Sequence, residues 1–283
     1  MKKTGFFEFG KKTYVMGILN VTPDSFFDGG KYFSLYDAVN HALRMQNEGA
    51  DIIDIGGQST RPGAKEISVE EEKKRVIPVI EKLIRKIKIP ISIDTYRSEI
   101  AKEALKLGAK MVNDVTALRG DKNLARVVAH YNVPVCLMHM KGEPKNMQEN
   151  PSYKDVVKEI SIFLKERADF AISCGIKKDK IIIDPGLGFG KRTGKGIEDN
   201  CEILRRLSEF KNLGYPIMIG PSRKTFIGNV CRKDAQLPVN ERLEGSLAAA
   251  CVAVLNGADI VRVHDVKETR RCMDLIDSII RKN

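Results

Sequence analysis

Eight apolar stretches, each running into a small set of polar residues, constrain the fold of this chain more than any other feature. They are TYVMGILN, DIIDIGG, ISID, MVND, VCLMH, IIIDPG, IMIGPS and IVRVHD. A helix-type pattern separates most neighbouring stretches. Near-continuous Val/Ile runs are typical of parallel strands whose outer faces are covered by helices. Eight strand–helix units in succession predict a closed (β/α)8 TIM barrel of the α/β class, and an open doubly wound sheet is the alternative.

The whole chain, residues 1–283, is predicted to be one domain. α/β barrels of this length are commonly a single unit, and no low-complexity segment or interdomain linker breaks the order of elements. Residues 1–12 are predicted to form a short N-terminal hairpin in which Phe7 and Phe9 alternate. This hairpin could plug the lower end of the barrel.

Local signals place several helices. Ser34 is a candidate N-cap of the first helix, and Ser68 with Glu71 forms a capping-box pattern at the start of the second. Later helices are expected near 155–174, 198–213, 244–256 and 267–281.

Composition limits the partners and the compartment. The formal net charge is +11, which fits a solvated lysine-rich surface, attraction of an anionic substrate, or nucleic-acid binding. The basic residues are spread along the chain, Trp is absent, and no nucleic-acid module motif occurs, so we expect no nucleic-acid partner. No stretch is long and apolar enough for a membrane span. Six scattered cysteines without metal-like spacing favour a reduced, cytoplasmic protein.

The polar residues at the ends of the predicted strands are the main candidates for function, because the active site of such a barrel lies at the C-terminal ends of its strands. They are Asn20, Gly57, Asp94, Asn113 with Asp114, His139, Asp184, Ser222 and His264. Asp94, Asn113 and Asp184 could together grip the edge of a polar heterocycle, since unpaired they would carry a desolvation penalty. The alternative is that Asp94 and Asp184 cap the next helices or satisfy nearby backbone.

Long loops after the first two strands point to lids or binding loops. TPDSFFDGG carries Asp24, Phe26 and Phe27, and STRPG carries Thr60 and Arg61. Ordinary turn chemistry is the alternative for each loop taken alone. At the other side of the predicted mouth, PSRK (221–224) and RVH (262–264) follow the seventh and eighth strands, where barrels frequently bind phosphate. Arg223, Lys224, Arg262 and His264 would supply the cationic donors there, unless they are solvated surface groups.

Taken together, the motifs resemble those of the dihydropteroate synthases. They are GILNVTPDSFFDGG, DIIDIGGQSTRPGA, SIDTYRSEIAKEALKLGA, NDVTA, LMHMKGEPKNMQ, IDPGLGFGK, GPSRKTFIG and RLEGSLAAA…GADIVRVHDV, in order from about residue 14 to 270. The resemblance implies condensation of 6-hydroxymethyl-7,8-dihydropterin pyrophosphate with p-aminobenzoate, giving dihydropteroate and pyrophosphate. It also implies a homodimer formed through the final helices and a site that sulfonamides occupy.

The resemblance also implies roles for residues. The pterin ring would contact Asp94, Asn113, Asp184 and Lys224, flanked by Met138 and Phe189. Pyrophosphate would be held by Arg61, Arg262 and His264, with Ser222 nearby, and Asn20 would be the residue linked to Mg²⁺. The p-aminobenzoate pocket would comprise Phe26, Thr60, Pro62, Phe189, Lys224 and Thr225. We expect Asp24, Asp184 and Lys224 to be the catalytic residues, because an acid can stabilise the electron-poor methylene left when pyrophosphate departs.

Three departures from the family pattern are present: Gln58 replaces the usual Glu, Phe27 replaces a common Ser, and KRTGKGIEDN is longer than usual. A pterin-dependent methyltransferase on the same barrel is the enzymatic rival, but it has no need of the two lids or the cationic cluster. A non-catalytic binding protein or nucleic-acid binder is the rival of another class, and it would be favoured if the ligands were lost.

Overall fold

Eight parallel strands form one sheet in the computed structural model, which describes residues 2–22, 35–59, 66–142, 146–194, 198–231 and 235–281. The strands are β3 (Tyr14–Asn20), β4 (Ile52–Gly56), β5 (Ile91–Asp94), β6 (Met111–Asp114), β7 (Val135–Met138), β8 (Ile181–Asp184), β9 (Met218–Ile219) and β10 (Ile260–Val263). Their order is β8-β7-β6-β5-β4-β3-β10-β9. The sheet closes through a parallel bridge between Ile183 and Ile217. The TIM-barrel prediction is confirmed, and the open doubly wound sheet is excluded.

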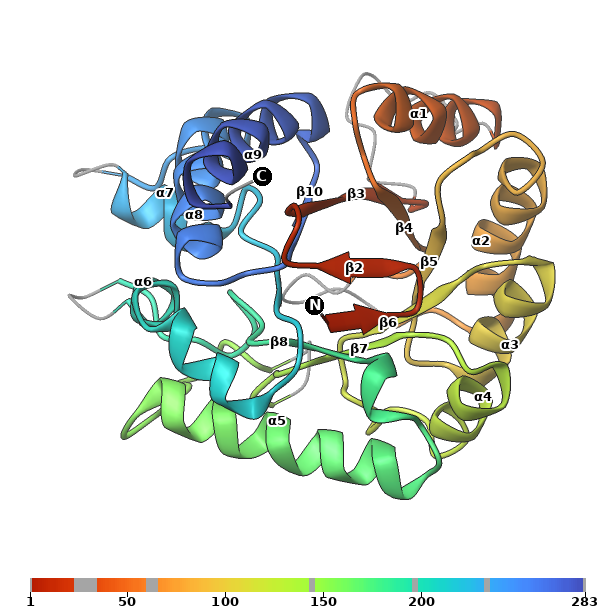
Figure 1. The fold of residues 1–283 in the computed structure, drawn as a ribbon, viewed down its shortest axis with the longest axis horizontal. Coiled ribbons are helices and arrows are strands. Elements are labelled where there is room, and N and C mark those ends of the chain that lie inside the picture. Colours follow the sequence, from red (N-terminus) through yellow and green to blue (C-terminus); the bar gives the residue numbers. More distant parts are fainter. Residues whose placement is uncertain are drawn as a thin grey trace.

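Helices surround this sheet (Figure 1). They are α1 (Leu35–Asn47), α2 (Val69–Leu83), α3 (Ser98–Leu107), α4 (Leu124–Tyr131), α5 (Val156–Ser173), α6 (Asp199–Arg205), α7 (Thr225–Val230), α8 (Leu243–Leu255) and α9 (Val266–Ile280). Short 3₁₀ turns are η1 (Lys178–Lys180), η2 (Leu207–Leu213) and η3 (Val239–Glu241). None of the helices in the described ranges is long and apolar enough to cross a membrane.

The predicted helix boundaries agree closely with the structure, with one exception. Ser68 caps α2 by accepting a hydrogen bond from the Glu71 N–H at 3.1 Å, as predicted, whereas Ser34 lies outside the described residues. The single helix predicted over 198–213 is wrong, because α6 ends at Arg205 and η2 follows. The break at Arg206 coincides with ion pairs from its guanidinium to Asp155 at the start of α5 and to Glu209.

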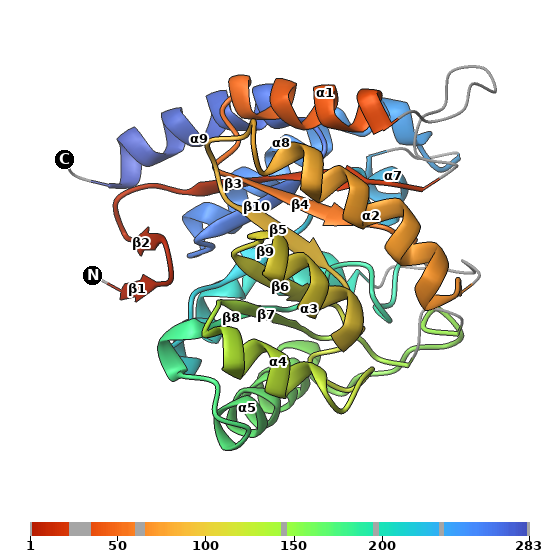
Figure 2. The same ribbon diagram turned by 90° about the vertical axis from the view of Figure 1, so that its right-hand side faces the viewer.

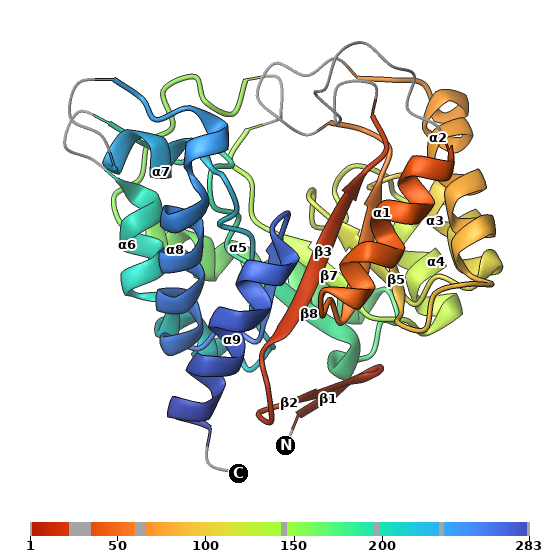
Figure 3. The same cartoon turned by 90° about the horizontal axis from the view of Figure 1, so that it is seen from above.

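The N-terminal residues form the expected hairpin, made of β1 (Lys2–Thr4) and β2 (Phe7–Phe9). Phe7 and Phe9 pack against the first inward-facing residues of the barrel strands, which are Met16, Ile52, Met111, Cys136, Ile182, Met218 and Ile260. Figures 2 and 3 show the hairpin at one end of the barrel, beside the C-terminal end of α9. The hairpin therefore seals the lower end with an apolar plug, as predicted.

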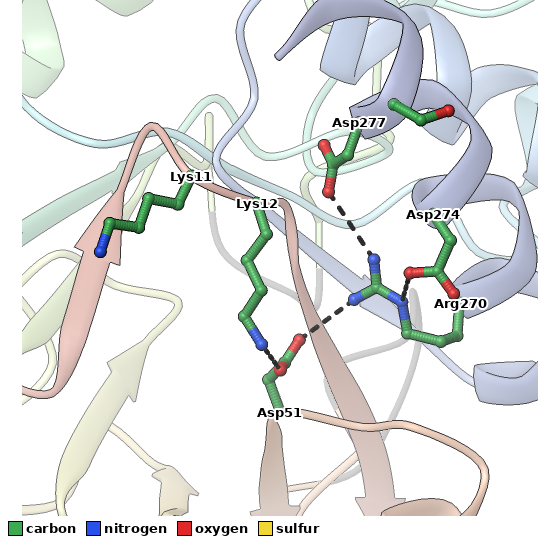
Figure 4. Close-up of a pocket in the computed structure, with 7 residues that line it drawn as sticks. Lys11, Lys12, Asp51, Arg270, Asp274 and Asp277 are labelled. Atoms are coloured by element: carbon green, nitrogen blue, oxygen red, sulfur yellow. Dashed lines mark hydrogen bonds and ion pairs between the residues drawn. The ribbon is translucent and has the colours of Figure 1, made fainter. Parts of the chain in front are cut away.

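A charged network lies beside this plug (Figure 4). Asp51 accepts from Lys12 and lies 3.3 Å from Arg270 Nη1, and Arg270 Nε lies 2.8 Å from Asp274 Oδ1. Asp277 accepts from the Thr13 N–H at 2.6 Å and hydroxyl at 2.7 Å. A hollow of about 360 Å³ separates these side chains. The network ties the hairpin, β4 and α9 together, and its opposite charges neutralise one another.

Period-two alternation along the strands decides which side chains enter the barrel. In β4, Ile53 and Ile55 join the core beneath the helices, while Ile52 contacts the plug. Asp54 lies between Ile53 and Ile55, and so points to the same side as Ile52, into the barrel. Because Ile52 takes the space nearest the plug, Asp54 is placed one layer higher, toward the C-terminal ends of the strands.

Candidate functional site

Four side chains from four strands meet inside the upper barrel. Asp54 Oδ2 accepts from Arg262 Nε at 2.6 Å and from Asn113 Nδ2 at 2.8 Å. Arg262 Nη2 reaches across to Asp94 Oδ2 at 2.6 Å. Strand register places Asp94 beside Asn113, so neighbouring strands present these groups at one level. The structure thus brings together three predicted residues and adds Asp54, which the sequence analysis did not single out.

The same cluster contains buried polar atoms without partners among the described residues. They are Asp54 Oδ1, Asn113 Oδ1 and Ser92 Oγ. A buried polar atom that lacks a hydrogen bond costs about 1–3 kcal/mol. A ligand that supplied hydrogen-bond donors to the upper barrel would remove this cost, so these atoms mark it as the candidate site.

Burial raises the pKa of two carboxyl groups in this region. The pKa of Asp94 rises to about 7, although Arg262 opposes the rise. The pKa of Asp184 rises to about 6 for the same reason, opposed by the Gly186 N–H, which donates to Oδ1 at 2.7 Å, and by the charge of Lys224. Desolvation disfavours the charged form of each acid. Both groups therefore gain by meeting a ligand that carries N–H donors.

The alternative stated for Asp94 and Asp184 holds in part for Asp184, which accepts from the Gly186 N–H, and the strand-end acid that satisfies its local turn in full is Asp114. Its Oδ1 accepts from the Thr116 N–H at 2.8 Å and hydroxyl at 2.7 Å, and its Oδ2 accepts from the Leu118 N–H at 2.6 Å. Adjacent residues on a strand face opposite sides. Asn113 therefore points into the barrel while Asp114 holds the following turn.

An apolar wall stands beside the acids. Met138 and Phe189, which were predicted to flank the ring, belong to one buried cluster with Val115, Met140 and Met147. Lys224 Nζ lies 4.3 Å from the centre of the Phe189 ring, a cation–π arrangement. The charge of Lys224 also acts on Asp184. The wall, a lysine and a carboxyl group thus border one space.

Two of the predicted cations, His264 and Arg223, differ from the expectation in different ways. His264 Nδ1 lies 2.9 Å from Ser222 Oγ, and burial beside Arg262 lowers the pKa of His264 to about 3. Because His264 is then neutral in the free protein, it would act as a hydrogen-bond donor and not as a fixed cation. Arg223 departs from the expectation, since Nε and Nη2 form a bidentate pair with Asp265 at 2.9 and 2.6 Å.

Other predicted residues stand at the same end or lie outside the described ranges. Asn20 is half-buried at the C-terminal end of β3, in register with Gly56. Thr225 is exposed at the start of α7. The side-chain amide oxygen of Gln58 is buried without a hydrogen-bond partner in the described part of the chain. The candidates on the two long loops lie outside the described residues: Asp24, Phe26, Phe27, Thr60, Arg61 and Pro62.

Two functional candidates escaped the sequence analysis for different reasons. A signal existed for Asp54, because an acid between Ile53 and Ile55 must face the barrel interior. Lys191 gave no comparable signal. It looks like a loop lysine, but its side chain is 1% exposed and its ammonium group is hydrogen-bonded within the loop after β8.

Comparison with known proteins gives a consistent result. The model of the family described as pterin binding enzyme matches residues 16–264. The dihydropteroate synthase of Escherichia coli is 47% identical over 267 residues, which cover 94% of this chain and 92% of that protein.

Solved structures agree in fold. A dihydropteroate synthase from Clostridium difficile, in the presence of pteroic acid, has a TM-score of 0.89 and 50% identity, covering 98% of this chain and all of that one. The Yersinia pestis enzyme with a sulfonamide drug has a TM-score of 0.90 and 41% identity, over 99% and 98% of the two chains. The Xanthomonas albilineans enzyme with 4-aminobenzoic acid has a TM-score of 0.87 and 44% identity, over 96% and 94%.

Proposed function

The chain belongs to the pterin-binding enzymes and, within them, to the dihydropteroate synthases, and from that membership we propose how its barrel mouth carries out the synthase reaction. The reaction joins the methylene carbon of 6-hydroxymethyl-7,8-dihydropterin pyrophosphate to the amine nitrogen of p-aminobenzoate. The C–O bond to pyrophosphate breaks, pyrophosphate leaves with the electron pair, and the amine loses one proton. The protein is therefore a transferase of folate synthesis.

One observation supports this assignment above the others: the upper barrel holds carboxylate and amide oxygens that have no partner in the described part of the chain. A pterin edge carries adjacent N–H donors on its ring and its 2-amino group. Two carboxylate oxygens match such a pair in geometry and charge. Asp184, whose pKa burial raises to about 6, is the proposed partner of this edge, and Asp94 and Asn113 are its neighbours across the mouth.

The wall formed by Met138 and Phe189 covers the face of the ring in this proposal. Lys224, above Phe189, would contact the ring and the amine substrate, with Thr225 at the rim. Phe26, Thr60 and Pro62 are proposed to complete the p-aminobenzoate pocket, and Asp24 to be a catalytic acid beside it, on loop sequence alone. Excluding water from this space would protect the electron-poor methylene from hydrolysis.

Departure of pyrophosphate requires neutralisation of the charge that grows on its oxygens. Arg262, His264 and Ser222 lie at neighbouring strand ends, and Arg61 is proposed from the sequence. Because Arg262 is paired with Asp54 and Asp94 in the free protein, it would contribute after the ring has engaged one of these carboxylates. Departure of pyrophosphate leaves a carbocation-like methylene whose charge spreads into the pterin ring, and the Asp184 carboxylate at the N–H edge of the ring can stabilise that charge. The aryl amine is already unprotonated at neutral pH and needs no strong base.

Magnesium fits this site only as a companion of the substrate phosphates. Within the described ranges no group of three His, Cys, Asp or Glu residues could hold a metal. Asn20 offers a single amide oxygen at the mouth, and Mg²⁺ commonly binds through one or two protein oxygens plus substrate phosphates and water. When bound, Mg²⁺ would supply charge neutralisation to the leaving pyrophosphate.

Mixing the two substrates with the protein should release pyrophosphate in a magnesium-dependent reaction. Chromatography of the dihydropteroate product measures turnover, with a no-enzyme control and an arm in which EDTA removes the metal. Turnover no faster than the control would refute the proposed function. Turnover that survives EDTA would refute only the magnesium proposal.

A homodimer through α8 and α9 is also proposed. Val252, Leu255, Leu275 and Ile279 are 42–66% exposed on these two contacting helices, and exposed apolar side chains on neighbouring helices support an interface there. Leu275→Glu with Ile279→Glu should convert a dimer to a monomer in analytical ultracentrifugation. Ile162→Glu on α5, where Ile162 is 52% exposed, is the matched control and should leave the mass unchanged. A monomeric wild type would refute the proposal.

The remaining proposals concern the setting of the enzyme. All six cysteines are free thiols, which supports a reducing compartment, the cytoplasm. Small molecules are the proposed partners, with no nucleic acid and no membrane. Sulfonamides are proposed to compete with p-aminobenzoate at the rim bounded by Lys224 and Thr225.

A further inference from the structure

Lys191 is a buried cation that the proposed reaction does not use. Its Nζ donates to the carbonyl oxygens of Gly186 at 2.8 Å and Phe189 at 2.9 Å, and lies 3.0 Å from His139 Nδ1. Three donors and three acceptors satisfy the ammonium group completely. Burial still lowers the pKa of Lys191 to about 7. A group that is costly to bury, and that has two of its three acceptors in one turn of the chain, points to a role in fixing that turn.

The turn formed by residues 186–190 has little room to rearrange. Gly186 and Gly190 have φ values of 71° and 61°. A Cβ on Gly186 would lie 2.0 Å from the His139 carbonyl oxygen, and one on Gly190 would lie 2.3 Å from that of Lys141. The turn is therefore pressed against the segment that follows β7. Lys191 fills the centre of the turn from within.

The turn carries a wall residue of the site at its apex. Phe189 is 9% exposed, and its ring faces Lys224. The carbonyl groups that accept from Lys191 belong to Phe189 itself and to the residue that begins the turn after Asp184. Tyr153 donates to the Gly190 carbonyl at 2.6 Å, and Asn200 accepts from the Gly188 N–H at 2.7 Å. These two contacts hold the turn from outside.

We propose that Lys191 is a positioning residue of the pterin pocket: its ammonium group holds the Gly186–Gly190 turn closed and thereby presents Phe189 to the ring beside Lys224. The inference rests on the proposed function of the site. It assigns Lys191 no contact with substrate and no proton transfer. The effect of Lys191 on pterin binding should depend on Phe189, and this dependence distinguishes it from a general loss of stability.

Lys191→Met tests the proposal, because methionine is nearly as long and has no donor. We expect the KM for the pterin pyrophosphate to rise at least tenfold while kcat changes less than threefold, since a wall contact is lost equally from the ground and transition states. Amide hydrogen exchange in residues 185–192 should quicken. Leu164→Ala, at a fully buried position of α5, is the control: it should lower the melting temperature and leave the KM unchanged.

A double-mutant cycle with Phe189→Ala tests whether Lys191 acts through Phe189. If Lys191 acts through Phe189, Lys191→Met should change the KM by less than twofold in a Phe189→Ala background. Fully additive effects, or an unchanged KM in Lys191→Met alone, would overturn the proposal. If Lys191→Met fails to fold, Lys191→Gln replaces it, because glutamine keeps two hydrogen-bond donors. The KM of Lys191→Gln should lie between those of the wild type and Phe189→Ala. A wild-type KM for Lys191→Gln would equally overturn the proposal. If the wild type shows no turnover, the proposed function fails, and hydrogen exchange still tests the positioning role.

Discussion

The two ends of the barrel use the same residue types in opposite ways. At the lower end, Asp51, Asp277 and Arg270 belong to a network in which the charges pair with one another and with backbone. At the upper end, Asp54, Asn113 and Ser92 retain polar atoms that have no partner among the described residues. The lower-end side chains are 12–15% exposed and lie in ion pairs; Arg270 Nε makes no hydrogen bond among the described residues but lies 2.8 Å from Asp274 Oδ1. The upper-end residues are at most 2% exposed, so their unpaired atoms are the more costly ones.

This difference separates a structural role from a ligand-binding role. The hollow of about 360 Å³ lies among the paired charges at the lower end, far from the strand termini that carry function in such barrels. Concavity alone would therefore select the wrong end. Fully buried polar atoms without partners among the described residues, Asp54 Oδ1, Asn113 Oδ1 and Ser92 Oγ, favour the upper end, because a ligand there can complete their hydrogen bonds.

Of the substitutions at the two ends, Asp184→Asn at the upper end should cause the largest loss of pterin affinity. We expect pterin affinity to fall by about 2–3 kcal/mol, because the neutral amide cannot replace a charge-assisted hydrogen bond. This equals about 30- to 150-fold in Kd, measured by calorimetry. Stability should not fall, since the substitution removes a carboxyl group that burial penalises. An unchanged Kd would place the ring elsewhere.

The pH dependence of stability should also originate at the upper end. The pKa values of Asp94 and Asp184 are raised to about 7 and about 6, so the folded state binds more protons than the unfolded state above pH 4. Their contribution to stability is therefore greatest at low pH and is lost as the pH rises through about 6–7. At about 1.4 kcal/mol for each pKa unit, each acid is expected to contribute a few kcal/mol.

Urea unfolding between pH 4 and 8 measures this effect. The wild-type free energy of unfolding should fall relative to that of Asp94→Asn/Asp184→Asn, which cannot titrate at these positions. A constant difference between the two proteins across this range would show that neither acid has a raised pKa.

The sequence predicted the barrel, the plug and most of the mouth because each follows from local periodicity. Buried strands end in polar residues, and alternation assigns Asn113 inward. The same rule would have found Asp54. It could not show that Arg262 pairs with Asp54 and Asp94, because that contact joins three strands distant in sequence.

The positions and contacts of loop residues were harder to predict from the sequence, for a physical reason. Lys191 and Arg223 look alike in sequence, as basic residues beside glycine or serine. One is buried within its own turn and the other pairs with Asp265 at the end of β10. The outcome depends on how the turns pack, which residue type does not encode. The break after α6 likewise coincides with a contact between distant segments, the ion pair from Arg206 to Asp155 at the start of α5.

The smallest predicted effect belongs to the lower end. Asp277→Asn should lower the free energy of unfolding by about 1–2 kcal/mol, because it weakens the hydrogen bonds from Thr13 and the ion pair with Arg281, whose Nε lies 2.8 Å from Oδ1. Pterin affinity should stay within twofold of the wild type, since these contacts lie at the opposite end. Urea unfolding and calorimetry on the same sample measure both. A large loss of affinity with little loss of stability would show that the two ends are coupled, and the division of roles between them would not hold.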